Sequence, residues 1–133
     1  MVSACGGAVD WEAGVFDETE ITVGAEALTV AVADTPQKRA RGLMEVEKLP
    51  AGLDGMLFVY EESKPATFHM LNTSIPLDIW WFDGGGSLIG AAPMEPCFVE
   101  PCLSFGSPGP VMWVLETPQD VYEFGPGEML STG

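Results

Sequence analysis

Basic residues are scarce in this chain of 133 residues: 5 Lys and Arg stand against 20 Asp and Glu, giving a formal net charge of -15. Nucleic-acid binding needs clustered Lys and Arg to neutralise phosphates, so the composition argues strongly against that class of partner. The same imbalance argues against electrostatic docking on anionic lipid. No apolar run approaches the roughly 18 residues that a membrane-spanning helix needs, so we expect no spanning helix.

Glycine and proline are abundant, by contrast, and they indicate short elements joined by many turns. The chain has 16 Gly and 11 Pro, a composition that favours a β-rich fold. Apolar and polar residues alternate over 21–33, which predicts a hairpin. A capping residue followed by proline at Thr35-Pro36 predicts a short helix, and Thr117-Pro118 predicts a second. We therefore predict a mainly-β fold, a compact single-domain β-barrel or sandwich with two short helices, over residues 19–133.

The chain has only three cysteines, and the residues around the first of them, Cys5, form a distinctive pattern. Cys5 follows Val2-Ser3-Ala4 and precedes Gly6, which has the shape of a bacterial lipobox, although the charged and hydrophobic parts of a signal peptide are missing before it. Residues 1–18 have the composition of a flexible leader. We expect a lipid anchor on Cys5 as the one membrane contact of an exported protein at the periplasmic or extracellular face of the cell envelope. A cytosolic protein with three ordinary thiols is the alternative.

The other two cysteines form an even pair, which suits an oxidising compartment. Four residues separate Cys97 from Cys102, which is not the spacing of a thioredoxin-like redox pair. A disulfide between them would close a short loop and contribute about 2 kcal/mol. A structural disulfide and free thiols both remain open.

An apolar segment over residues 68–83 is the best candidate for a site, because polar residues interrupt it at a few places. Aromatic rings beside an amide and a carboxylate are a common way to hold sugars and small polar molecules. The candidate ligand-binding residues are Phe68, His69, Asn72, Asp78, Trp80 and Trp81. A small polar or saccharide-like molecule is the expected ligand.

A structural interpretation of the same polar residues competes with this one. Asn72 and Thr73 would close a turn through side-chain to backbone hydrogen bonds. Asp78 would pair with Arg41, since a basic helix needs an acidic partner, and such a buried pair would depress the pKa of the Asp78 carboxyl. We favour the turn for Asn72 and Thr73 and leave both roles open for Asp78.

Several blocks in order along the chain carry a family resemblance. They are Arg41-Gly42-Leu43-Met44, then Gly55-Met56-Leu57-Phe58, then Asn72-Thr73 followed by Ile75-Pro76-Leu77-Asp78. These blocks resemble the uncharacterised prokaryotic family catalogued as domain of unknown function 192, over about residues 27–130. The resemblance implies a compact mainly-β domain, often behind a signal peptide or lipobox, and no established activity, cofactor or catalytic residue. His69 departs from the family pattern, which commonly has an aromatic residue there, usually Trp.

Residues suited to catalysis or metal binding are few. The chain has one His, no Gly-x-Ser-x-Gly elbow and no phosphate-binding glycine motif. A hydrolase-type enzyme that uses Asp78 with His69 or Glu116 is the alternative function. A soft-metal site of His69, the cysteines and the methionines is the weakest, because the methionines are scattered. We therefore expect a non-enzymatic binding or accessory module of the cell envelope, with no metal and no cofactor.

Overall fold

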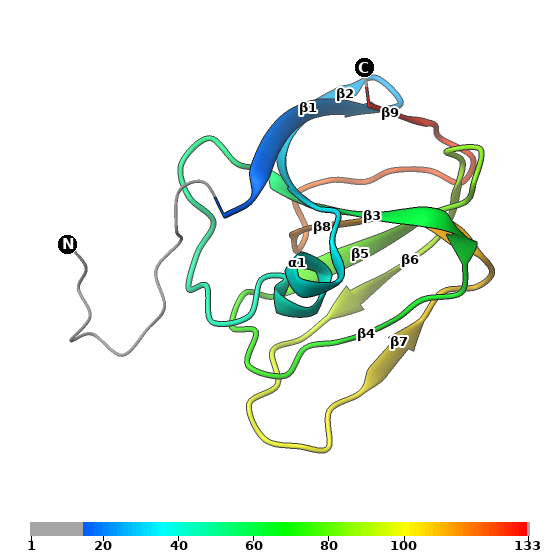
Figure 1. The fold of residues 1–133 in the computed structure, drawn as a ribbon. Helices are drawn as coiled ribbons and strands as arrows, with labels where there is room; N and C mark the ends of the chain where they lie inside the picture. Colours follow the sequence, from blue (N-terminus) through cyan, green and yellow to red (C-terminus); the bar gives the residue numbers. More distant parts are fainter. Residues whose placement is uncertain (1–14, 133) are drawn as a thin grey trace.

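Alternating apolar and polar residues build one long, curled sheet. The computed structural model describes residues 15–132, and Figure 1 shows its strands wrapped into a half-barrel with a smaller two-stranded sheet below. The seven strands of the large sheet follow the order β6-β5-β8-β3-β2-β1-β9, and β4 pairs with β7. The elements are β1 (Asp17–Val23), β2 (Glu26–Ala33), α1 (Pro36–Arg41), β3 (Gly55–Lys64), β4 (Thr67–His69), β5 (Leu77–Phe82), β6 (Leu88–Met94), β7 (Ser104–Gly106), β8 (Val111–Pro118) and β9 (Leu130–Ser131). The mainly-β single-domain prediction is confirmed.

The predicted hairpin and the first predicted helix are both present. β1 and β2 pair antiparallel on either side of the turn at Gly24. The Thr35 side chain then accepts a hydrogen bond of 3.2 Å from the Lys38 backbone N–H, and Pro36 occupies the first turn of α1. The helix ends at Arg41, because Gly42 takes a positive φ of 49°. β2 and β3 are parallel, and α1 lies on the crossover between them.

The second predicted helix is wrong. β8 continues through Thr117 and Pro118, which pair with β5. The Thr117 hydroxyl accepts a 3.0 Å hydrogen bond from Trp80 Nε1 instead of capping a helix. Pairing with a neighbouring strand therefore overrides the local cap-and-proline pattern.

Both faces of the sheet are buried, and they form two separate cores. β5 shows the split most clearly: Ile79 and Trp81 belong to one core, and Trp80 and Phe82 to the other. We name the first the helix-side core, since the segments after α1 and around β4 and β7 cover it. The second core lies against the C-terminal segment, which contributes Leu130.

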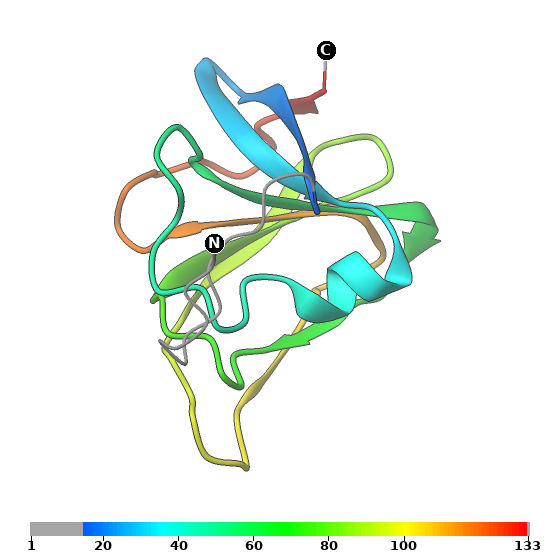
Figure 2. The same cartoon turned by 60° about the vertical axis from the view of Figure 1, so that its left-hand side comes forward.

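The ends of the sheet approach each other at the C-terminal segment. Leu130 N–H donates a 2.8 Å hydrogen bond to Gly86 O, and Leu88 N–H donates one of 2.9 Å to Glu128 O. β9 also pairs with β1, and Figure 2 shows this red segment beside the blue N-terminal hairpin. The C-terminal segment therefore ties the first strand in sequence to the start of β6.

The N-terminal part of the chain is described from residue 15. Phe16 is buried in the helix-side core and β1 begins at Asp17, so the last residues of the predicted leader, 16–18, belong to the folded domain. Cys5 lies outside the described residues. Within residues 15–132, none of the helices has the length and apolar character needed to cross a membrane.

Gly55→Ala should destabilise the fold strongly, because the added methyl group would collide with the backbone carbonyl oxygen of Glu116. We expect a loss of about 1–3 kcal/mol or more in the free energy of unfolding, the range for overpacked sites. Gly106→Ala is the matched control, because nothing lies within 4 Å of its added methyl. Urea unfolding of both variants checks this; equal effects of the two substitutions would contradict it.

Candidate functional site

The predicted ligand-binding segment is divided among β4, a turn and β5, so its side chains do not share one face. Phe68 is half-buried and packs edge-to-face against Phe58 and Trp81, with ring centroids 4.9 and 5.6 Å apart. Trp80 and Trp81 are 6% and 3% exposed and lie in different cores. Neither tryptophan therefore offers an open face on which a sugar ring could stack.

Asn72 acts through the backbone of a turn. It has a positive φ of 60°, which Asn tolerates better than most residues. Its N–H donates a 2.7 Å hydrogen bond to Cys97 O, and its own carbonyl accepts one of 2.7 Å from Glu45 N–H. Thr73 N–H closes the turn on Met70 O at 3.0 Å. The turn is present as expected, but these backbone bonds hold it.

Asp78 lies at the end of the β5–β8 pair. Its Oδ2 accepts a 3.0 Å hydrogen bond from Asp120 N–H, where Asp120 has a positive φ of 66°. The predicted pair with Arg41 does not form: among residues 15–132 the salt bridge that occurs joins Lys38 to Asp34 at 3.7 Å. Asp78 is on β5, whereas Arg41 ends α1, the helix that precedes β3. β8 lies between β5 and β3 in the sheet, so the two residues are on separated elements.

Cys97 and Cys102 are joined in a disulfide, which is one of the two alternatives that the sequence left open. Cys97 also forms isolated β-bridges with Leu71 and Thr73. The bridged loop therefore supports the turn that follows β4, so a covalent closure steadies the segment between β4 and β5.

A small pocket lies between α1 and β4, over the helix-side core. Its volume is about 160 Å³, below the roughly 300–1,000 Å³ of sites for drug-sized ligands. The lining comprises residues 39–44, Phe58 and Tyr60 of β3, residues 67–70, Thr73, and Glu116 of β8. Phe68 and His69 are thus the predicted ligand-binding residues that the pocket brings together; Asn72, Asp78, Trp80 and Trp81 are not among its lining residues.

Glu116 is the unusual group of this pocket. It is 4% exposed, and no salt bridge joins it to another described residue. Burial raises the pKa of the Glu116 carboxyl from 4.5 to about 8, because a charged carboxylate loses its hydration there. Burial therefore favours the protonated, neutral form of this side chain at neutral pH.

Arg39 and Tyr60 form a cation–π pair on the wall of the pocket. The Arg39 guanidinium carbon lies 4.8 Å from the centroid of the Tyr60 ring, and its Nη1 donates a 2.9 Å hydrogen bond to Val59 O. Burial raises the pKa of the Tyr60 hydroxyl; Arg39 opposes this shift and Glu116 adds to it. Tyr60 is therefore the group that interacts electrostatically with both Arg39 and Glu116.

His69 lines the same pocket from an exposed position in β4. Its Nδ1 accepts a 3.2 Å hydrogen bond from Leu71 N–H, which leaves Nε2 as the donor of the neutral ring. Among the described residues, no group of three or more His, Cys, Asp and Glu side chains is placed to hold a metal ion.

Comparison with known proteins identifies the family. The model of DUF192, described as an uncharacterized ACR, matches residues 19–130. The chain belongs to the DUF192 family. No curated protein matches it significantly.

Two crystal structures resemble this DUF192 domain. A proposed transcription regulator from Sinorhizobium meliloti 1021 is 26% identical, with a TM-score of 0.75 over 86% of this chain and 93% of the other. A protein of unknown function from Novosphingobium aromaticivorans DSM 12444 is 24% identical, with a TM-score of 0.78 over 95% of this chain and 93% of the other. The second likeness shows the fold alone.

Sequence reasoning missed most of the pocket. It named Glu116 as a possible partner of Asp78, but it did not place Arg39, Tyr60 or Thr67 at a site. A lone acid within the apolar strand β8 was an available signal, since an acid between buried residues of a central strand is rarely solvated.

Glu116→Gln should remove a pH dependence of stability. Between about pH 4.5 and 8 the folded protein keeps a proton on Glu116 that the unfolded chain has released. The contribution is therefore fully present below about pH 4.5 and is lost as pH rises to about 8, by up to about 1.4 kcal/mol per pH unit. Urea unfolding of both proteins across this range measures it. If the unfolding free energies of the wild type and Glu116→Gln differ by the same amount at every pH, the raised pKa of Glu116 is contradicted.

Proposed function

We propose that the protein is a non-enzymatic binding module whose site is the pocket between α1 and β4. The observation that carries this proposal is Glu116, an acid in an almost fully buried position that lines the pocket and forms no salt bridge with another described residue. A carboxyl group so placed loses much of its hydration. A bound molecule that hydrogen-bonds Glu116 would offset that loss.

The lining supports a small molecule in preference to a macromolecule. Aromatic and methionine side chains provide apolar walls, while Arg39, His69, Thr73 and Glu116 provide polar groups. Convergent polar groups beside apolar walls fix the orientation of a small ligand. A saccharide-like ligand would have to be bound by these polar groups, because Trp80 and Trp81 are buried and cannot stack on a sugar ring.

An enzyme is the second candidate, and Glu116 favours it as well. A carboxyl with a pKa of about 8 is a suitable general acid near neutral pH, and His69 lines the same pocket. Asp78 has no part in this version, because it does not line the pocket. Within residues 15–132, the hydrogen bond to His69 Nδ1 comes from the Leu71 backbone and not from a Ser, Thr or Cys side chain, as an activated nucleophile would require, so we rank binding first. A soft-metal site is the weakest candidate, since the disulfide occupies the two thiols of Cys97 and Cys102.

Nucleic-acid binding is not part of the proposal. The S. meliloti relative is described as a proposed transcription regulator, but this chain carries a formal net charge of -15. Phosphate backbones repel such a protein unless it presents clustered basic residues. We therefore propose no nucleic-acid partner.

The proposed location is the cell envelope, with a lipid anchor on Cys5. The Cys97–Cys102 disulfide supports this location, because disulfides persist in oxidising compartments and are rare in the cytosol. The proposed ligand would then be an envelope or extracellular solute.

Ligand binding should be detectable by calorimetry and should depend on the pocket. A panel of monosaccharides, short carboxylic acids, and the matching amides and amines would be screened against the wild-type chain. Thr67→Trp, at a lining position in β4, should weaken any hit at least about tenfold by filling the pocket. Thr19→Trp, at an exposed position in β1, is the control and should leave binding unchanged. Absence of heat and of thermal shift across the whole panel would overturn the proposal.

Mass spectrometry of the protein from native membranes should find acyl chains on Cys5 and, without reduction, a peptide that joins Cys97 to Cys102. Lipidation requires the Cys5 thiol, so Cys5→Ser should move the protein to the soluble fraction. An unmodified Cys5 in the native protein would refute the anchor, whatever the state of the disulfide.

A further inference from the structure

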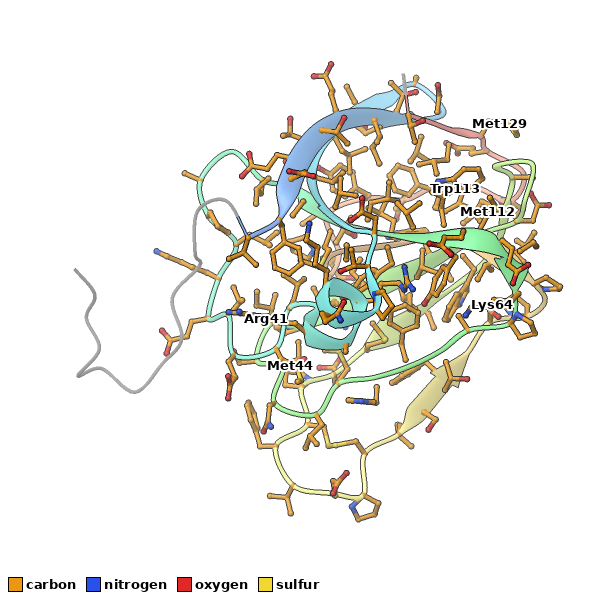
Figure 3. All side chains as sticks on the ribbon, in the orientation of Figure 1. Arg41, Met44, Lys64, Met112, Trp113 and Met129 are labelled. Atoms are coloured by element: carbon orange, nitrogen blue, oxygen red, sulfur yellow. A yellow bond between two sulfur atoms is a disulfide. The ribbon has the colours of Figure 1, made fainter. Side chains whose placement is uncertain are left out.

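Positive charge is concentrated around the pocket in a protein that is otherwise strongly acidic. Two of the five Lys and Arg residues, Arg39 and Arg41, line it. Lys64 lies 5.4 Å from the ring centroid of Tyr60, a lining residue. Figure 3 shows Arg41 at the end of α1 and Lys64 on the opposite side of the view, at the end of β3. Among the lining residues, two Arg side chains stand against one acid, Glu116.

The Arg39 side chain is held in position by two contacts that leave some of its N–H donors available. Its Nη1 donates to Val59 O and its guanidinium stacks on the Tyr60 ring. A guanidinium carries five N–H donors in a rigid fork that suits carboxylates. Within residues 15–132, Val59 O is the one acceptor for this group, so a ligand oxygen can use the others.

Glu116 adds a hydrogen-bond donor to the pocket. As a neutral acid it has one O–H to donate, and an anionic acceptor is its strongest partner, because hydrogen bonds to charged groups are roughly twice as strong as neutral ones. A bound ammonium would find only the carbonyl oxygen of the neutral acid as an acceptor, and it would lie in a pocket lined by two arginines. The pocket therefore fits an anion better than a cation.

We propose that the pocket binds a small organic carboxylate, with Arg39 on its charged head group and Glu116 donating a hydrogen bond to it. This assignment rests on the small-molecule function proposed above and specifies its ligand class. Phe58, Phe68 and Met70 contact the carbon tail. The volume of about 160 Å³ limits that tail to a short chain or a single ring.

The titratable and charged groups that face Glu116 across the pocket are Arg39 and Arg41 of α1, Tyr60 of β3 and His69 of β4. The arginines keep their charge at any pH at which the protein is folded. Burial raises the pKa of Tyr60 above its usual 10, so its hydroxyl ionises later than Glu116. A change in affinity between pH 7 and 9 therefore reports on Glu116.

The first test compares head groups on one carbon chain: pentanoate, pentanamide and pentylamine, measured by calorimetry at about pH 6.5 with the full chain. We expect pentanoate to bind at least about tenfold more tightly than the other two. Equal binding of the amide, or tighter binding of the amine, would overturn the carboxylate assignment and leave the pocket as a ligand site. If none of the three binds but another panel member does, the carboxylate assignment fails alone. If nothing in the whole panel binds, the proposed function fails with it.

The second test removes one positive charge at a time. Arg39→Gln should weaken pentanoate binding at least about tenfold. Lys48→Gln makes the same charge change at an exposed position outside the pocket and should leave the affinity within about twofold. Arg39→Lys keeps the charge without the fork and should recover part of the loss. Equal effects of Arg39→Gln and Lys48→Gln would show that net charge alone attracts the ligand and would overturn the assignment.

The third test follows the proton on Glu116. In the wild type, the affinity for pentanoate should fall up to about tenfold per pH unit above about pH 8, as the acid ionises. Glu116→Gln retains an N–H donor, so its affinity should stay near the wild-type value at low pH and lose this dependence. A purely structural role for Glu116 predicts identical pH profiles, and that result would overturn its proposed hydrogen bond.

Discussion

Burial of both faces of the central strands is the constraint on which the rest of this structure depends. β3, β5 and β8 lie inside the sheet order, and their alternate side chains enter two different cores. A slip of one residue would exchange the two sets of side chains, so the register is strongly specified. The same constraint leaves Glu116 no solvent-exposed face, since the residues on both sides of it in β8 are buried.

The pocket follows from how that sheet is covered. The parallel pair β2–β3 requires a crossover, and here the helix of the crossover has only six residues. The short basic helix α1, the turn after it and β4 cover the helix-side core. They leave a pocket there that Glu116 lines. Arg39 is then held near a neutral acid by a backbone carbonyl and an aromatic ring. Packing imposes this arrangement, and it places two arginines on one small pocket of an acidic protein.

Local signals in the sequence predicted what they physically control. Thr35 caps α1 with proline in its first turn, and Asn72 takes the left-handed conformation that a turn residue of its type tolerates. The same local logic failed at Thr117, where pairing with β5 outweighed a cap followed by proline. The predicted pair of Arg41 with Asp78 failed for a different reason. Opposite charges in a sequence do not show whether another strand lies between the elements that carry them, and here β8 lies between β5 and β3.

The sequence by itself therefore determined the mainly-β class, the turns and caps, and the acidic surface, because each depends on composition or on neighbours within a few residues. Only the tertiary structure decided that Glu116 would lie with Arg39, Tyr60 and His69 around one pocket. These residues come from four elements, and β8 enters the sheet between β5 and β3. The shift in the Glu116 pKa has the same origin, because desolvation depends on what covers a residue and not on its neighbours along the chain.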